Sequence, residues 1–513
     1  MRALAQRAGG VARFAMVSLL GFGFALALYQ AWDLDLRWFA VVVTGIAAVG
    51  LSLCLVRVFS DYLLIAMLFC LPLSSFQKWI WPSGYADYEH GNFVYSGVLG
   101  IGIIDFILIG LYASWFYRIF ISREQAPPRL TRLDLFVGWF VLAHFVSVIG
   151  SPDAELGFGA SEFLLKHALF YFYLSRNFSA RHVPWLLAAF ASAVALDTAL
   201  GGYQYATGKL LGIALDKGAG GSALDYQYQV PGIESYYRAT GTSYDSHSLG
   251  HFMALILPFP LVLCFTPGVK VTLKGGFVLV CAGALLTIGL SLSRAAWVSA
   301  AIALLVGVVL IVVIWQERQV VPALAVAVVA AALITPAIGH FVYERFAESP
   351  YETLSTRFDQ YEVGWRVFLY FPLFGAGPGN WIPTLNRFDF LWLPPLPIHD
   401  VVLWTATEVG LFGTVPYLAI LGSTMLRLFT VVRRRRDIAA RLSLAALLAM
   451  MVTVLNGLTD PTFREPNVYL MFWILVGLSI ALPLLPPSAG RVLLARRGPA
   501  AVAARAGRGA VAT

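Results

Sequence analysis

Residues 295–315, AAWVSAAIALLVGVVLIVVIW, form an apolar run that contains no charged side chain. A helix of about 20 such residues crosses the hydrocarbon core of a bilayer, so this run predicts a transmembrane helix. Similar runs recur throughout the 513 residues, of which 59% are hydrophobic and 12% are charged. Soluble domains carry roughly 25% charged residues. The composition therefore indicates a membrane protein with many spans and excludes a globular enzyme with a single anchor.

The apolar runs predict an all-α polytopic membrane protein with about fourteen transmembrane helices. They are continuous rather than alternating, which excludes an outer-membrane β-barrel. The four cysteines lie inside apolar runs and predict neither disulfides nor a metal site. The predicted spans lie near 12–30, 38–57, 61–77, 98–117, 134–150, 161–177, 183–205, 246–266, 275–292, 295–315, 320–340, 398–425, 441–459 and 467–486.

The basic segments predict the orientation of the chain. Arg433–Arg436 and the tail 487–513 are rich in arginine, which favours the cytoplasmic side of a membrane. With both termini cytoplasmic, the long connections 78–97, 206–245 and 341–397 lie on the outer side. The net charge of +8 is thereby explained by membrane topology, and no nucleic-acid partner is implied.

The outer connection 341–397 has an internal pattern. Phe358, Tyr361, Trp365 and Phe368 recur near helical spacing with polar residues between them, which predicts an amphipathic helix on the membrane surface. Pro372 and the glycines that follow it predict that this helix ends in a tight loop.

His399 and Asp400 stand where a span begins, in PPLPIHDVVLWTATEVGLFG from Pro394. One interpretation is a boundary histidine beside an aspartate that marks the helix start. The other is a general base, because imidazole with a pKa near ~6.5 can take a proton from a sugar hydroxyl. Both interpretations stay open at this point. Glu408, further along the same span, and His251, one turn into another, are candidates to face the same site.

Several arginines are candidate phosphate ligands, because the planar guanidinium fork suits phosphate oxygens. Arg294 separates two apolar runs, and a buried guanidinium there costs ~2.5–3.5 kcal/mol on insertion scales, so it usually faces a partner or cavity. Arg238 precedes another predicted span, and Arg357 and Arg366 lie in the outer connection 341–397. The alternative for each is a snorkelling or solvated surface charge.

Other polar patterns are weaker. Asp33 and Asp35 copy a two-carboxylate metal motif that is common by chance. A hydrolase-like set is Ser243, Asp245, Ser246 and His247, but residues that are neighbours in sequence do not by themselves make a catalytic triad.

A transporter would use charged residues inside its spans, and here these are Asp105, Lys166 and Asp197. A further polar group on the outer rim is Asn456, Asp460 and Arg464.

Four segments occur in a characteristic order between residues 230 and 425: RATGTSYDSHSLGHFMALILP from Arg238, SRAAW from Ser293, PLFGAGPGN from Pro372 and HDVVLWTATEVGLFG from His399. Together they resemble the O-antigen ligase/polymerase superfamily of bacterial inner-membrane glycosyltransferases. This chain has Asp400 where the family more often has asparagine, which leaves the acceptor open.

The resemblance implies a GT-C-type helical bundle with large periplasmic loops in the inner (cytoplasmic) membrane. It implies that a glycan passes from undecaprenyl pyrophosphate to an acceptor sugar hydroxyl in one inverting displacement, without metal or cofactor. His399 would be the base, and Arg294 and Arg238 would stabilise the leaving pyrophosphate. The expected substrate-binding residues are Arg366, Arg357, Asp400, Glu408 and His251.

The expected function is a polymerase for cell-surface polysaccharide such as O-antigen, capsule or exopolysaccharide. The alternative is an O-antigen ligase that attaches finished glycan to lipid A core or protein, and a second alternative is a flippase for lipid-linked oligosaccharide. An assembly scaffold is a further class. The expected partners are the lipid-linked donor, the growing polysaccharide or lipid A core acceptor, membrane lipid and a chain-length regulator.

Overall fold

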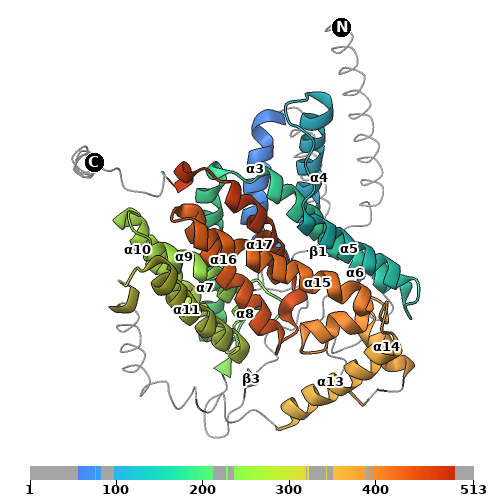
Figure 1. The fold of residues 1–513 in the computed structure, drawn as a ribbon. Helices are drawn as coiled ribbons and strands as arrows, with labels where there is room; N and C mark the ends of the chain where they lie inside the picture. The colour runs from blue at the N-terminus through green and yellow to red at the C-terminus, as the bar shows by residue number, and fades with distance from the viewer. Residues whose placement is uncertain are drawn as a thin grey trace, which may run out of the picture.

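The computed structural model describes residues 56–75, 77–82, 97–211, 227–228, 236–318, 320–322, 343, 351–388, 390, 392–393 and 397–490. Within them the chain is a bundle of α-helices with two short antiparallel ribbons (Figure 1). The predicted all-α polytopic membrane protein is thus confirmed in outline. The two short β-ribbons were not predicted from the sequence. The predicted span near 12–30, most of those near 38–57 and 320–340, and most of the basic tail lie outside the described residues, as do Asp33 and Asp35.

The described helices cover most of the predicted spans. Their bounds are α3 Val56–Phe69, α4 Ile103–Phe116, α5 Arg132–Val148, α6 Ala154–Asn177, α7 Val183–Thr207, α8 Ser246–Ile256, α9 Pro258–Cys264, α10 Val271–Ser291, α11 Arg294–Trp315, α13 Tyr351–Tyr370, α14 Trp381–Arg387, α15 Val401–Arg434, α16 Ile438–Gly457 and α17 Pro466–Leu484. Strand β1 (Gln77–Pro82) pairs with β2 (Gly97–Gly102), β3 (Gln227–Tyr228) pairs with β4 (Tyr236–Tyr237), and the short helix η4 (Thr462–Arg464) precedes α17.

Among the described residues, 8 helical segments are long and apolar enough to cross a membrane. They are Ile103–Ile121, Ala180–Thr207, Ser246–Cys264, Val271–Ser291, Arg294–Trp315, Val401–Arg434, Ile438–Gly457 and Pro466–Leu484. The predicted spans near 61–77, 134–150 and 161–177 are also helical, as α3, α5 and α6. Helices α3 and α5 are short, with 14 and 17 residues, and α6 carries acidic and basic side chains along its 24 residues. The predicted span near 98–117 begins instead with β2.

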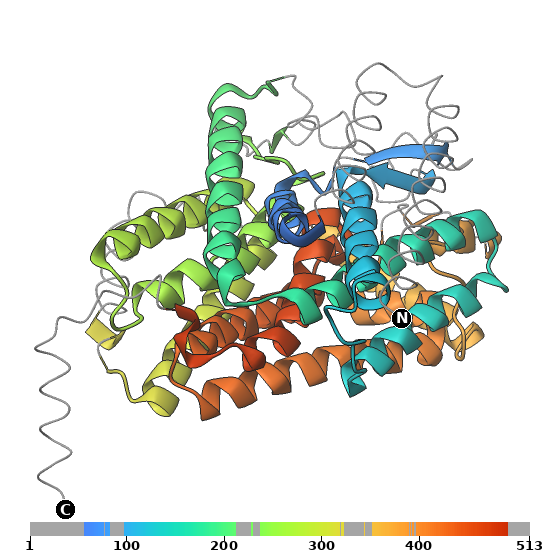
Figure 2. The same cartoon turned by 90° about the horizontal axis from the view of Figure 1, so that it is seen from above.

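The helices divide into a central and a peripheral set. Most of each central span is enclosed by protein: 83% for α8–α9, 83% for α16 and 89% for α17. Only 22% of α10 and 28% of α11 are buried in the same way. Figure 2 shows α10 and α11 at one side of the bundle and α5 and α6 at the other, with α16 and α17 between them. The exposed apolar side chains of α10 and α11 therefore face where lipid would lie.

The two ends of the bundle differ in chemistry. At one end, Arg436 donates to the carbonyl oxygen of Ile314 at 2.9 Å, and the Arg441 guanidinium pairs with Glu317 and lies 3.8 Å from the centre of the Trp315 ring. These contacts join the end of α11 to the end of α15 and the start of α16, beside the arginine-rich segment. The α10–α11 turn, the start of α15 and the connection between α16 and α17 lie at the other end.

The predicted amphipathic helix is present as α13, and the loop that follows it crosses α15. Gly410 has φ 59°, ψ −165° and divides α15 into two helical segments. Four backbone hydrogen bonds join the loop to this break: Leu411 N–H to Pro372 O at 2.8 Å, Phe412 N–H to Leu373 O at 3.0 Å, Ala376 N–H to Thr407 O at 2.8 Å and Gly377 N–H to Glu408 O at 2.9 Å. The groups freed by the helix break are thereby satisfied inside the bundle.

Two glycines make this crossing sterically feasible. A Cβ on Gly375 would lie 2.2 Å from the backbone carbon of Glu408, and a Cβ on Gly410 would lie 2.3 Å from that of Leu373. Both glycines also have positive φ, at 72° and 59°, a region that residues with a Cβ rarely adopt. The glycines of PLFGAGPGN and EVGLFG are therefore explained by the close approach of two backbones.

We predict that Gly410→Ala lowers the free energy of unfolding by about 3 kcal/mol, because it combines an unfavourable φ with a backbone clash. The matched control is Gly422→Ala in the same helix, where a Cβ meets nothing within 4 Å. The thermal unfolding midpoint of each purified variant in detergent measures the difference. Equal midpoints for the two variants would contradict the role assigned to the crossing.

Candidate active site

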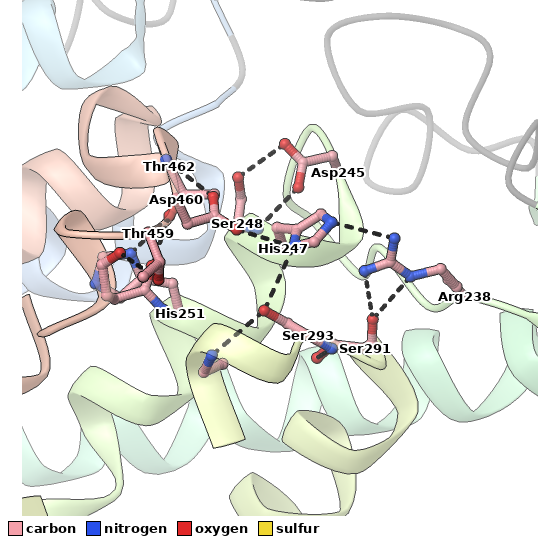
Figure 3. Close-up of polar contacts among 12 residues, drawn as sticks. Arg238, Asp245, His247, Ser248, His251, Ser291, Ser293, Thr459, Asp460 and Thr462 are labelled. Atoms are coloured by element: carbon pink, nitrogen blue, oxygen red, sulfur yellow. Dashed lines mark hydrogen bonds and ion pairs between the residues drawn. The ribbon is translucent and has the colours of Figure 1, made fainter. Parts of the chain in front are cut away.

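Arg238 is attached to the turn between α10 and α11. Its Nε and Nη2 both donate to the carbonyl oxygen of Ser291 at 3.1 Å (Figure 3). Ser291 ends α10, Leu292 reverses the chain with φ 54°, and α11 begins at Arg294. The last carbonyl groups of a helix lack partners within it, so the guanidinium satisfies one of them. Arg238 itself is 7% exposed.

Helix α7 holds the backbone that follows Arg238. The Gln204 Oε1 accepts from the N–H groups of Thr240 at 2.9 Å and Gly241 at 2.8 Å, and Asp197 Oδ1 accepts from Thr242 N–H at 2.8 Å. Gly241 has φ 56°, and a Cβ there would lie 2.5 Å from Asp197 Oδ1. The RATGT segment is thus a loop fitted onto two buried side chains of α7, and Asp197 has a structural contact there.

His247 lies in the first turn of α8 between a carboxylate and a guanidinium. Its Nδ1 is 2.9 Å from Asp460 Oδ2, and its Nε2 is 3.2 Å from Arg238 Nη1 (Figure 3). A guanidinium only donates, so Nε2 accepts and the ring proton resides on Nδ1, directed at Asp460. Asp460 lies between α16 and α17 with 5% of its side chain exposed, against 34% for His247.

His399 lies two residues before the start of α15 and is held by α13. Its Nδ1 is 2.7 Å from Oε1 of the buried Gln360. The amide oxygen accepts, so Nδ1 carries the proton and Nε2 carries the lone pair. Burial and the nearby Arg357 guanidinium lower the pKa of His399 to about 4, against the opposing charge of Asp460. The imidazole is therefore neutral near pH 7 and can accept a proton.

Asp460 links the two histidines electrostatically. Burial alone would raise its pKa, but the adjacent His247, with His399 and Arg357, holds the pKa well below its ordinary value. The carboxylate is therefore ionised among these groups. We call Arg238, His247, Asp460, His399 and Arg357 the polar cluster. Its members come from the loop before α8, from α8 itself, from the α16–α17 connection, from α13 and from the segment just before α15.

Arg294 begins α11 beside the polar cluster. The preceding residue, Ser293, caps α11 by accepting from Ala296 N–H at 3.4 Å, and its hydroxyl lies 3.5 Å from His247 Nδ1. Arg294 is half-buried and lies at the same end of the bundle as His399. In the described part of the chain, no three His, Cys, Asp or Glu side chains are grouped so that they could hold a metal ion.

Residues 277–418 match the family model described as O-antigen ligase. No curated protein matches the chain. The match covers less than half of the chain, and it supports the O-antigen ligase/polymerase superfamily.

The O-antigen ligase segment runs from within α10, through α11, α13 and α14, into α15. It contributes Arg294, Arg357 and His399 and contains the crossing at Gly375 and Gly410. The remaining members of the polar cluster, Arg238, His247 and Asp460, come from outside the matched residues. The resemblance based on four ordered segments is thereby confirmed at the level of the superfamily.

Two predicted substrate-binding residues of the O-antigen ligase segment have contacts of their own. Asp400 caps α15, because its Oδ1 accepts from Leu403 N–H at 2.7 Å. Glu408 is 1% exposed and pairs with Arg464, and its Oε1 accepts from Trp404 Nε1 at 2.8 Å. Glu408 thus ties α15 to η4 below the polar cluster.

Of the remaining three predicted residues, Arg357 belongs to the polar cluster, whereas His251 and Arg366 are not members of it. His251, fully buried one turn deeper than His247, has Nδ1 2.8 Å from Thr462 Oγ1. Arg366 forms an exposed ion pair with Glu362 on α13. Positions 357 and 366 are nine residues apart, which puts them on opposite faces of a helix with 3.6 residues per turn. The structure therefore does not bring Arg366 to the cluster.

The sequence placed His247 only in a weak hydrolase-like set and Asp460 only in a polar group on the outer rim, and it did not single out Gln360. His247 and Asp460 lie at the outer ends of two different apolar runs, which is the one signal that could have joined them. Gln360 is one of several polar residues between the aromatic positions of α13, and only the packing of α13 on α15 distinguishes it.

We predict that Arg357→Gln raises the pKa of His399 above about 4, because it removes a cationic neighbour that disfavours imidazolium. Nuclear magnetic resonance of histidine-labelled protein, with the signal assigned by His399→Asn, measures this pKa. The control is Arg366→Gln, which removes an exposed arginine of the same helix and should leave the pKa unchanged. A fall of the His399 pKa in Arg357→Gln would refute this electrostatic account.

Proposed function

We propose that this protein is a membrane glycosyltransferase that polymerises glycan repeat units from undecaprenyl-pyrophosphate donors at the outer face of the bacterial inner membrane. The observation that carries the proposal is a neutral imidazole, His399, held beside guanidinium groups at one end of a chain that contains an O-antigen ligase segment. That end is opposite the arginine-rich end, which charge bias assigns to the cytoplasm.

His399 acts as the general base in this proposal. Its Nδ1 is held by Gln360, so Nε2 takes the proton from the acceptor sugar hydroxyl. The hydroxyl oxygen attacks the anomeric carbon of the donor as the bond from that carbon to the pyrophosphate oxygen breaks. The electron pair leaves with lipid pyrophosphate, and one displacement inverts the anomeric centre.

The arginines stabilise the departing pyrophosphate. Arg238 and Arg357 belong to the polar cluster, and Arg294 follows Ser293, whose hydroxyl lies 3.5 Å from His247 Nδ1. In this proposal their guanidinium groups stabilise the negative charge that develops on the pyrophosphate. Pyrophosphate on a lipid is already a good leaving group, and guanidinium groups neutralise it. The proposed reaction is therefore independent of a divalent cation.

Within this class we favour polymerisation over ligation. The long outer connections provide surface for a growing glycan, and the described part of 341–397 exposes aromatic side chains such as Trp365 and Tyr370, which suit stacking on sugar rings. Transfer of finished glycan to lipid A core or protein is the alternative, because the matched family model is described as O-antigen ligase.

We predict that His399→Ala reduces polymer formation by about 10²–10⁴-fold, the range for loss of a general base. Glycan analysis of cells that carry the variant, with protein abundance measured in the same membranes, provides the test. Lipid-linked single repeats should accumulate on the outer side. Gly422→Ala serves as the control for expression and folding.

The same analysis separates the other classes. If long chains are lost but one glycan repeat is still attached to the lipid A core, the protein is a polymerase. If no glycan is attached to the core at all, it is a ligase. Repeats that accumulate on the inner side would favour a flippase. Wild-type glycans from His399→Ala and Arg294→Ala cells would favour a scaffold and overturn the proposed catalysis.

We predict that a chelator such as EDTA leaves the transfer rate of the purified protein within about twofold, because charge neutralisation is assigned to guanidinium groups. Transfer is followed with a purified lipid-linked donor. A loss of activity that added Mg²⁺ or Mn²⁺ restores would contradict this assignment.

A further inference from the structure

We propose that Asp460 and His247 form a positioning dyad that orients the Arg238 guanidinium toward the donor pyrophosphate. The inference rests on the proposed function and adds two residues that lie outside the O-antigen ligase segment. It also assigns them a role distinct from that of His399, since they act through Arg238 rather than on the reacting sugar.

The Arg238 guanidinium is held from two directions. On one side, Nε and Nη2 bond the Ser291 carbonyl oxygen, and on the other, Nη1 bonds His247 Nε2 (Figure 3). A long arginine side chain has many rotamers, and contacts at both ends of its fork select one plane. Pyrophosphate recognition depends on that plane, because the planar fork presents its N–H groups in fixed directions.

Asp460 determines which nitrogen of His247 carries the proton. A carboxylate 2.9 Å from Nδ1 favours the Nδ1–H form, which leaves Nε2 as an acceptor for Arg238. The opposite tautomer would place an N–H against a guanidinium N–H, two donors face to face. The buried Asp460 carboxylate therefore acts through His247, by keeping Nε2 available as the acceptor for Arg238.

The local packing makes the carboxylate hard to replace. Asp460 has 5% of its side chain exposed, and its Oδ1 also accepts from Thr462 N–H at 3.3 Å. Thr462 Oγ1 in turn lies 2.8 Å from His251 Nδ1. The Asp460 side chain is thus fixed by the α16–α17 connection, so the position of the His247 ring is fixed with it.

The test compares His247→Gln with His247→Ala. Glutamine retains an amide oxygen that can accept from Arg238, whereas alanine removes the acceptor. We expect His247→Ala to lower kcat/KM for the lipid-linked donor by about 10–100-fold, the range for a misplaced binding group. We expect His247→Gln to stay within a few fold of wild type, and the KM for the acceptor glycan to be unchanged in both.

Two further variants distinguish positioning from loss of folding. Asp460→Asn keeps the side-chain volume but no longer favours one tautomer, so it should lower the same donor parameter less than His247→Ala does. In the Arg238→Ala background, His247→Ala should have little additional effect, because the group that it orients is gone. Unfolding midpoints of all variants are measured alongside.

A second histidine–aspartate pair provides the matched control. His182 Nε2 lies 3.3 Å from Asp61 Oδ1 at the start of α7, at the opposite end of that helix from Gln204, which holds the Arg238 loop. His182→Ala should leave the donor and acceptor parameters unchanged. A donor-specific loss in this variant would overturn the assignment of the effect to the Arg238 contact.

The outcomes separate this inference from the proposed function. If His399→Ala abolishes transfer while His247→Ala is fully active, the dyad proposal fails and the function stands. If His247→Gln is as inactive as His247→Ala, His247 transfers a proton itself and the positioning role is overturned. If purified wild-type protein and His399→Ala transfer glycan equally or not at all, the proposed function fails, and this inference fails with it.

Discussion

The close backbone crossing of the 371–377 loop and α15 is the constraint on which the candidate active site depends. His399 comes just before α15, whereas Gln360 and Arg357 come from α13, and these two helices are joined through the crossing. Backbone hydrogen bonds fix the register of the two segments, and the glycines allow an approach that any Cβ would prevent. A helix break inside a membrane protein is tolerated here because its freed groups are paired within the protein.

The polar cluster combines groups whose charges depend on one another. The ionised Asp460 lies among two imidazoles and the Arg357 guanidinium, and His247 in turn contacts Arg238. Burial strengthens each of these interactions, because little water screens them. With the His399 imidazole neutral, the guanidinium groups of Arg238 and Arg357 outnumber the single carboxylate. The cluster is therefore cationic on balance, as a site for an anionic leaving group requires.

Continuous apolar runs made the strongest helices predictable, and the prediction was weakest where polar residues interrupt a span. Helix α6 carries Lys166, whose ion pair with Asp105 of α4 at 3.5 Å only the folded chain reveals. The ordered motifs predicted the superfamily and located His399, Arg294 and Arg238. The contact between His247 and Asp460 joins residues far apart in the chain, and no periodicity or spacing within one segment encodes it. Arg366 was selected by residue type, and the helical phase of α13 places it on the other face.

The unequal enclosure of the helices has a consequence for how the protein responds to its surroundings. Helices α16 and α17, whose connection supplies Asp460, contact almost only protein, whereas α10 and α11 form the outer wall. A change in bilayer thickness or acyl-chain order acts first on the wall helices through hydrophobic mismatch. Such a change does not act directly on α16 and α17, which hold the Asp460 carboxylate. The geometry of Asp460 should therefore depend little on the surrounding lipid.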